Sequence, residues 1–429
     1  MKNLIRSALV FLMTAASVAS AGSLPVPLEP QQTSMWCWAA SGSMIMHYLG
    51  ASRVTQCDEA NRRFNRTDCC NSPTPSACVV GGWPEFQKYG FTFNTTNNTA
   101  LSWSSLVSEI NANRPVAFSW GWTGGGGHMM VAKGYTVTRT DNLVDVNDPW
   151  APNVGDTYFI SYSEYVSGSD HVHWDDYYNI RNSPPCSRDF HDLPASSFQG
   201  CFDYWAWRDR WPVTLAAYTP SSTTLMAGSF QNVNSRPVRT LMTGAQFQSY
   251  FNTYSAQGWR PEQINVLSTS NGPRFTVIWT PVDGQFQTHF GLTEAQMSAK
   301  FSELWNAGYL QVDMAVYEDN GIKFASTWVK KAHSGYATYW GMTQASYNQK
   351  FSDFASQGLR PVRFSAYPTA NGTRYAAIWH PAATGFIHYY NMTSATYQST
   401  YNDVAGMGAG FKLSQLNALD DRISAIWTK

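Results

Sequence analysis

Hydrophobic and polar residues recur with a period of 50 residues in the C-terminal half of the chain. In each unit a hydrophobic residue is followed by Thr, and more hydrophobic residues stand four and eight positions after the Thr. That spacing places them on one face of a helix, and Thr is a favoured helix N-cap. The four predicted helix starts are Met242-Thr243, Leu292-Thr293, Met342-Thr343 and Met392-Thr393. In the first three units a glycine then ends the predicted helix.

A β-hairpin is predicted after each helix. Alternating residues lead to an Asn-Gly turn in three units, at Asn271, Asn320 and Asn371, and the second strand of every unit ends in Trp. These Trp residues are Trp279, Trp328, Trp379 and Trp427. A further short strand leads to the next unit, and the predicted units lie near 238–287, 288–337, 338–387 and 388–429. Because the aromatic residues recur at fixed positions, we expect them to pack in a core rather than to bind a ligand.

A fifth, degenerate unit is predicted near 190–237. It has Leu193-Pro194 at the position of the other pairs, Phe198 and Phe202 on the helical stripe, and Phe230 near the Trp position. The ends of a repeat stack face water, so an atypical terminal unit is expected there. Residues 186–429 are therefore predicted to form a repeat domain of about five helix-plus-hairpin units.

The first residues are typical of an export signal. Lys2 and Arg6 precede an apolar run, and Ala19-Ser20-Ala21 is a small-residue cleavage site. The run of about 11 residues is too short to span a bilayer comfortably, so no membrane anchor is expected. The sequence predicts a signal peptide over 1–21, a mature chain from near Gly22, and a secreted or periplasmic location.

Charge excludes one class of partner. The chain has 29 Lys and Arg residues against 29 Asp and Glu residues, so no basic excess exists to neutralise phosphates and no nucleic-acid partner is expected.

The seven cysteines point to disulfides and one free thiol, because an exported protein can hold disulfides. The cysteines are Cys37, Cys57, Cys69, Cys70, Cys78, Cys186 and Cys201. We expect two bridges within 57–78, with the pairing open, one bridge from Cys186 to Cys201, and Cys37 left over.

Cys37 is the candidate nucleophile. Small and apolar residues at helical spacing follow it, so a helix is expected to begin at Cys37. The free N–H groups and the dipole at a helix start favour the thiolate, and the same N–H groups can hold an oxyanion. Gln31 could add a side-chain donor, with Gln32 as the alternative.

His128 is the candidate base. It follows Gly124–Gly127 and starts an apolar run, as expected for a loop that enters a strand. We expect the glycines to let a substrate backbone pass close by. Asp148 follows another strand-like segment and could orient the imidazole, with the adjacent Asn147 as the alternative.

These residues resemble the papain-like cysteine peptidases. The Gln-x5-Cys spacing, Trp36-Cys37-Trp38, His128 before small apolar residues, and Asp148-Pro149 are most similar to the bacteriocin-leader-peptidase-like and plant-pathogen-effector-like groups. Over about residues 25–180 the resemblance implies a Cys-His-Asp peptidase that hydrolyses peptides or proteins without a cofactor. The repeats are similar to bacterial tandem repeats beside peptidase or hydrolase domains, which implies an accessory module whose ligand is unknown.

The predicted fold class is thus α+β, with a papain-like two-lobe domain over 22–185 and the repeats after it. Two other functions remain open: a cell-wall peptide amidase with the same nucleophile, and an inactive secreted binding protein. His171 and His173 lie two residues apart in a predicted strand, which allows a metal site, although a polar strand end is the simpler interpretation.

Overall fold

The computed structural model describes residues 21–331, 335–381 and 384–429. The predicted signal peptide lies outside this range except for Ala21. The chain divides into two compact units between Ser183 and Pro184. No helix within the described ranges is long and apolar enough to cross a membrane.

The N-terminal unit is built on one antiparallel sheet, in the order β2-β7-β3-β4-β5-β6, with β1 paired to β4. Its strands are β1 Ala21–Ser23, β2 Phe91–Thr95, β3 Val116–Trp122, β4 Gly127–Val137, β5 Asn142–Asp148, β6 Asp156–Ser161 and β7 His171–Asn182. Its helices are α1 Cys37–Tyr48, α2 Gln56–Phe64, α3 Trp103–Asn111 and α4 Tyr162–Val166, with short 3-10 turns at Ser76–Cys78 and Phe86–Tyr89.

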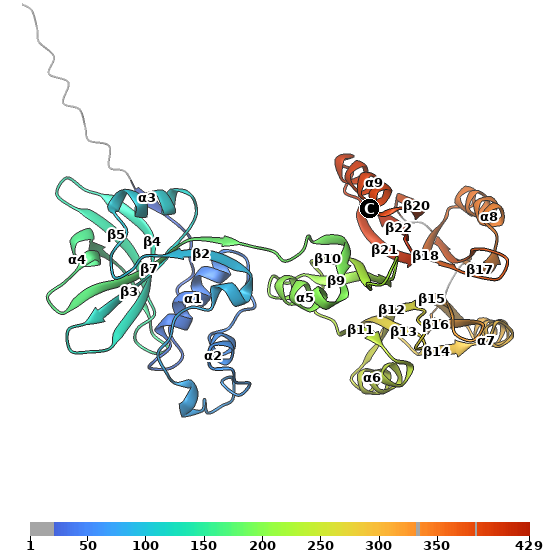
Figure 1. Cartoon of the computed structure of the whole chain (residues 1–429), viewed down its shortest axis with the longest axis horizontal. Helices are drawn as coiled ribbons and strands as arrows, with labels where there is room; N and C mark the ends of the chain where they lie inside the picture. The colour runs from blue at the N-terminus through green and yellow to red at the C-terminus, as the bar shows by residue number, and fades with distance from the viewer. Residues whose placement is uncertain (1–20, 332–334, 382–383) are drawn as a thin grey trace, which may run out of the picture. The chain divides into compact units, whose positions relative to one another are not determined.

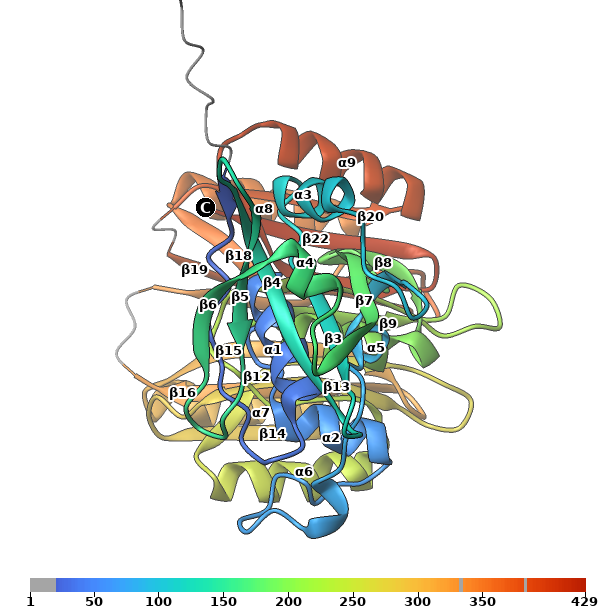
Figure 2. The same cartoon turned by 90° about the vertical axis from the view of Figure 1, so that its left-hand side faces the viewer.

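Helix α1 is the central helix of this unit and packs against β3, β4 and α2 (Figure 2). Every residue from Trp38 to Met46 is buried, as is typical of a helix that is apolar or small on all sides. The Ser41 hydroxyl donates to the Met129 carbonyl at 3.1 Å, which fixes the helix against β4. The sheet and this helix hold the beginning of α1 in place.

The structure decides the disulfide pairing that the sequence left open. Cys57 is bonded to Cys70, and Cys69 to Cys78. The first bridge links α2 to the disulfide-linked excursion that follows it, residues 65–80, and the second closes a loop within that excursion. The third bridge joins Cys186 to Cys201. Among the described residues Cys37 is the only free cysteine.

The C-terminal unit contains repeated three-stranded sheets. In each one a lead-in strand and the first hairpin strand flank the second hairpin strand, and a helix follows the lead-in strand. The units at 189–231 and 238–281 consist of β8 Asp189–Pro194, α5 Phe198–Ala206, β9 Trp211–Tyr218 and β10 Leu225–Gln231, then β11 Val238–Met242, α6 Gly244–Ala256, β12 Trp259–Leu267 and β13 Arg274–Pro281. The next consists of β14 Phe286–Leu292, α7 Glu294–Asn306, β15 Tyr309–Glu318 and β16 Ile322–Lys330. The last two consist of β17 Ala337–Met342, α8 Gln344–Ser356, β18 Leu359–Tyr367 and β19 Arg374–Pro381, then β20 Phe386–Met392, α9 Ser394–Gly406, β21 Lys412–Leu419 and β22 Arg422–Thr428.

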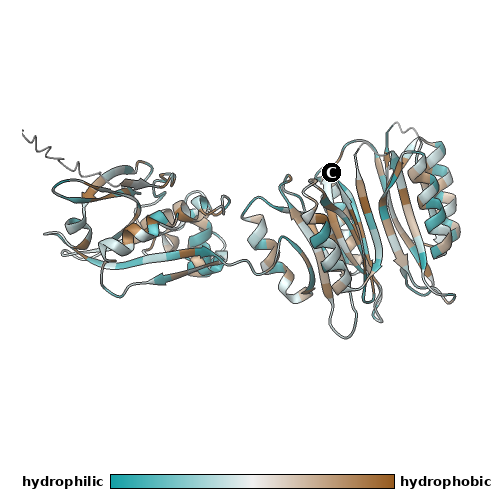
Figure 3. Cartoon of the chain, turned by 90° about the horizontal axis from the view of Figure 1, so that it is seen from above, coloured by the Kyte–Doolittle hydropathy of each residue, from teal (hydrophilic) through white to brown (hydrophobic). Residues whose placement is uncertain are grey.

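The N-cap and core predictions for these units agree with the structure. The hydroxyl of each predicted capping Thr accepts from a backbone N–H in the first helical turn. The four repeat Trp side chains are at most 1% exposed. Hydrophobic residues gather on the strands, while the helices carry hydrophilic residues outward (Figure 3).

The predicted boundaries after 287 and 387 fall too late along the chain, whereas the boundary before 238 coincides with the start of β11. Strand β14 begins at Phe286 and pairs with β16, and β20 begins at Phe386 and pairs with β22. The predicted cuts after 287 and 387 pass through these strands. The lead-in strand belongs to the sheet of the unit that follows it. Hydrophobic alternation alone does not specify to which of the two neighbouring units this strand belongs.

The repeats form a closed ring, so the expected open stack is wrong. The first hairpin strands β9, β12, β15, β18 and β21 contact one another in sequence, and β21 also contacts β9. Figure 1 shows these strands toward the centre and helices α5–α9 around the outside. The Leu416 N–H donates to the Thr214 hydroxyl at 2.7 Å, across the junction of the last and first units. The degenerate first unit therefore contacts a neighbour on both sides and has no end that faces water.

A polar residue, buried in four units and partly buried at Arg363, lies one position after a bulge in the first hairpin strand of each unit. These equivalent residues are Thr214, Gln263, Asp313, Arg363 and Gln415. Several of them bond a neighbouring unit: the Leu215 N–H donates to Gln263 Oε1 at 3.0 Å, and Arg363 Nε donates to Asp313 Oδ1 at 2.8 Å. Neighbouring units belong to separate sheets, so their facing backbone groups do not pair with each other. The side chains at this position supply hydrogen-bond partners for those backbone groups instead.

Candidate active site

Cys37 is the first residue of α1 and is half-buried. The two flanking tryptophans hold this helix start: Trp36 Nε1 donates to the Cys78 carbonyl at 2.7 Å, and Trp38 Nε1 donates to the Val80 carbonyl at 3.1 Å. Since Cys78 is bridged to Cys69, the disulfide-linked excursion supports the position of the thiol. The free N–H groups of the first helical turn stabilise negative charge at this point.

His128 and Asp148 come from the adjacent strands β4 and β5. His128 Nε2 lies 2.6 Å from Asp148 Oδ1, and both side chains are largely buried. Asp148 also accepts from the Tyr158 hydroxyl at 2.7 Å and from the Trp150 N–H at 2.8 Å. The carboxylate is thus fixed by three donors and orients the imidazole ring.

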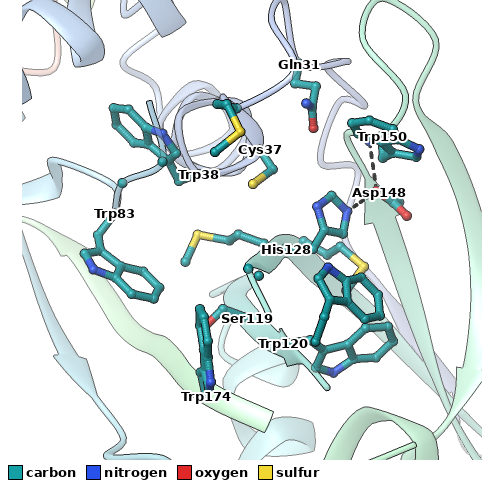
Figure 4. A pocket seen from close by; sticks show the side chains of 18 of the residues that line it. Gln31, Cys37, Trp38, Trp83, Ser119, Trp120, His128, Asp148, Trp150 and Trp174 are labelled. Carbon is teal, nitrogen blue, oxygen red and sulfur yellow. Dashed lines mark hydrogen bonds and ion pairs between the residues drawn. The ribbon is translucent and has the colours of Figure 1, made fainter. Parts of the chain in front are cut away.

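The other side of the imidazole faces the thiol. Figure 4 shows the Cys37 sulfur pointing toward the His128 ring, and the Cys37 side chain is among the groups that raise the pKa of His128. Because Nε2 is bound to Asp148, Nδ1 is the nitrogen left for Cys37. This geometry can hold a proton between sulfur and nitrogen.

The site electrostatics favour a charged imidazolium. Burial lowers the pKa of His128, but hydrogen bonds and charge from Asp148 and Cys37 outweigh it and raise the pKa to about 9. Burial raises the pKa of Asp148, yet the bonds from His128, Trp150 and Tyr158 bring it below its ordinary value. Asp148 is therefore ionised and His128 protonated at neutral pH.

The two residues with sequence alternatives lie in distinct surroundings. Gln31 is fully buried and lines the pocket beside Cys37; its Nε2 donates to the Thr33 carbonyl at 2.7 Å, which leaves a second N–H. Gln32 is exposed, and its backbone N–H bonds Gln56. Asn147 points to the opposite face of β5, where its Nδ2 donates to the Val26 carbonyl at 3.0 Å. Strand alternation explains why Asn147 and Asp148 cannot share the site.

A pocket of about 710 Å³ opens beside Cys37 and His128. Six tryptophans contribute to its walls: Trp38, Trp83, Trp120, Trp122, Trp150 and Trp174 (Figure 4). Apart from His128, which Asp148 holds, the cation that lines the pocket is Arg63, and it is paired with Glu85 at 3.2 Å. The recess therefore suits an apolar group.

For Gly127, one of the four glycines before His128, the expected role needs correction. Gly121 and Gly127 pair across β3 and β4, and Trp174 covers both of them. A Cβ on Gly121 would lie 2.0 Å from the Trp174 indole nitrogen, and one on Gly127 would lie 2.4 Å from the same ring. Gly127 thus makes room for a pocket wall rather than for a substrate backbone.

His171 and His173 cap the end of helix α4. Their ring nitrogens lie 2.9 Å from the Glu164 carbonyl and 2.8 Å from the Tyr165 carbonyl. Within the described ranges no histidine belongs to a cluster with metal-binding spacing, and the two clusters present use disulfide-bonded cysteines. The metal hypothesis for this strand is unsupported.

Sequence reasoning missed the contributions of Tyr158, Trp83 and Trp174. The paired glycines at 121 and 127 are a signal for a large ring above them, but only once the register of β3 and β4 is known. Tyr158 carries no local signal, because its role depends on the pairing of β5 with β6.

Comparisons with known protein families find two matches, one in each part of the chain. Residues 20–166 match the family model described as papain-like cysteine protease AvrRpt2. Residues 238–282, 283–331, 333–382 and 383–429 each match the family described as polyglycine hydrolase-like, structural repeat. These two matches support a cysteine-type peptidase with a repeat region, as the sequence predicted. No curated protein matches the chain significantly.

Proposed function

We propose that this protein is an exported peptidase in which Cys37, His128 and Asp148 form the catalytic triad. The observation that carries the proposal is the unbridged Cys37 sulfur, which faces a ring held by a carboxylate at 2.6 Å. The buried amide of Gln31 and the helix start beside it support an oxyanion site.

The proposed reaction follows from these positions. The Cys37 thiolate attacks the substrate carbonyl carbon, and the negative oxygen accepts from the Gln31 side chain and from the N–H at the start of α1. His128 gives its proton to the leaving amine and then takes one from the water that releases the acyl group. Asp148 keeps the ring oriented and stabilises its positive charge.

The organisation of the chain is part of the proposal. Residues 22–185 would form the peptidase domain, with a helical lobe that carries Cys37 against a β lobe that carries His128 and Asp148. Residues 186–429 would form a binding or regulatory module that takes no part in the chemistry. Export through the 1–21 signal fits three disulfides that close within short stretches of chain.

The aromatic pocket supports a preference for a large apolar substrate side chain. Indole rings offer extensive apolar area, and the nearby Arg63 is neutralised by Glu85. Substrates with an acidic side chain at this position would lose hydration without gaining a free cation.

The experiment is labelling of the full-length protein with a thiol-directed peptidyl epoxide, followed by mass spectrometry of the labelled site. We expect modification of Cys37 in the wild type, its loss in Cys37→Ala, and slow labelling in His128→Ala. Hydrolysis of denatured protein by the wild type but not by Cys37→Ala would support a peptidase. Release of soluble fragments only from peptidoglycan would instead identify the cell-wall amidase, and absence of labelling in folded protein would refute the mechanism.

A further inference from the structure

A second cavity lies within the repeat region, at the junction of its first and last units. It has a volume of about 350 Å³ and is lined by residues of both units, among them Phe230 and Gln231 from the first and Phe411 and Trp427 from the last. The volume is at the lower end of the range for small-molecule sites, so it could hold a group about as large as one amino-acid residue. None of the catalytic groups proposed above belongs to it.

The charged residues around this cavity leave an excess of positive charge. Arg188, Arg210 and Lys412 line it against the single acid Asp189. Asp189 is already saturated, because it accepts from Ser229, from the Tyr401 hydroxyl at 2.7 Å and from Arg188 at 3.2 Å.

Two of these cations have no partner within the described part of the chain. The side chains of Arg210 and Lys412 make no hydrogen bond or ion pair with any described residue. In the second unit the equivalent of Lys412 is Arg260, which is bonded to Asp283 at 2.7 Å. An unpaired cation at the edge of a cavity is available for an anion from outside.

The position of Arg210 sets this junction apart from the others. It lies two residues before Pro212, and the equivalent residues before Pro261 and Pro361 are Trp259 and Leu359. At this position the first unit thus has a charged residue, at its junction with the last unit, where the second and fourth units have an apolar one. The degenerate sequence of the first unit has a local chemical consequence.

The remaining lining supplies donors and apolar walls. The Trp427 indole N–H is buried and has no acceptor among the described residues, a property that the other three repeat tryptophans share. Phe230 and Leu413 provide apolar surface beside the two cations. A guanidinium pairs well with a carboxylate through two parallel hydrogen bonds.

We propose that this junction pocket binds a carboxylate carried by a small apolar or aromatic group, with Arg210 and Lys412 as the anion-binding residues. Two sources offer this chemistry: the free C-terminal residue of a peptide, and a free organic acid. The proposal is independent of the triad, because none of its residues takes part in the proposed hydrolysis.

The test is calorimetric titration of the full-length protein with N-acetyl-L-phenylalanine, its amide, 3-phenylpropionate and inorganic phosphate. We expect the acid to bind at least about tenfold more tightly than the amide, and Arg210→Gln or Lys412→Gln to weaken binding by at least about tenfold. The matched control Lys300→Gln removes one positive charge from helix α7 and should leave the affinity unchanged. Unchanged melting temperatures would verify that the variants are folded.

The probes also distinguish the two sources. Tighter binding of N-acetyl-L-phenylalanine than of 3-phenylpropionate would indicate a peptide C-terminus, and the reverse order would indicate a free acid. No heat at about 10 mM probe, equal affinity for acid and amide, equal affinity for phosphate, or full binding by both variants would overturn the proposal.

Discussion

Replacing Asp148 with Asn tests the electrostatics of the site directly. The substitution removes the negative charge that lies 2.6 Å from His128 Nε2 while it keeps the size of the side chain. The carbonyl oxygen of Asn can still accept from the Trp150 N–H or from Tyr158, so we expect the fold to survive. What changes is the charge that favours the protonated ring.

The expected magnitude follows from the two groups that raise the pKa of His128. Burial opposes them, and together Asp148 and Cys37 raise that pKa from 6.5 to about 9. Without the carboxylate only Cys37 opposes burial, so the pKa should fall by about one to two units. Under the proposed mechanism the protonated ring is the acid, and therefore activity is lost as pH rises through this pKa.

The assay is kcat/KM on a fluorogenic peptide between pH 5 and pH 10. We expect the alkaline limb near pH 9 in the wild type and about one to two units lower in Asp148→Asn. The matched control is Asp156→Asn, which removes a carboxylate opposite Asp148 on β6. An unmoved limb in Asp148→Asn, or an equal shift in Asp156→Asn, would refute the reasoning.

The same ion pair should appear in the stability of the fold. The pKa of His128 is higher in the folded protein than its ordinary value, so the folded state holds this proton more tightly. Its contribution to the free energy of unfolding is complete below about pH 6.5 and is lost as pH rises through about 9. Chemical denaturation across this range should show the loss in the wild type and a smaller one in Asp148→Asn.

Three other outcomes are expected. Gly121→Ala should displace Trp174 and lower kcat/KM for substrates with a large apolar side chain. The control Gly124→Ala adds a Cβ that meets no atom within 4 Å and should leave kcat/KM unchanged. Equal kcat/KM for the two variants would contradict the proposed pocket wall. Trp328→Ala should lower the free energy of unfolding by about 3–5 kcal/mol in a denaturant titration, since the ring is fully buried, and a loss near zero would contradict its core position. Thr214→Val should cost about 1–3 kcal/mol, because it leaves buried donors at the ring junction without an acceptor, whereas Thr214→Ser should restore most of the loss.

Local sequence determined the start of each important element. A helix begins at Cys37 because small and apolar residues follow it without interruption, and a helix begins after Thr243 because its hydroxyl caps the first turn. The odd number of cysteines predicted a free thiol, and the family matches confirm the predicted class of enzyme. These features depend on residues within about ten positions of one another, where spacing fixes geometry.

The register of the strands decided what lies around the proposed catalytic residues. The sequence allowed either Asn147 or Asp148 beside the histidine, and only the pairing of β4 with β5 assigns one to each face of the sheet. Trp174 comes from β7, far along the chain, and reaches the pocket because β3 lies between β7 and β4. A shift of one residue in any of these ladders would reverse the faces, and no local signal encodes that choice.

Closure of the ring is the clearest case of a property that tertiary structure alone decided. The 50-residue period specified a repeating unit, but an open stack and a ring bury the same stripe of each helix. Which one forms depends on the angle between successive units, and that angle is set by how the bulged central strands and residues such as Thr214 and Gln263 meet. The sequence by itself thus determined the unit and the chemical character of Cys37, whereas packing over long separations determined the ring, its junction pocket and the walls of the active site.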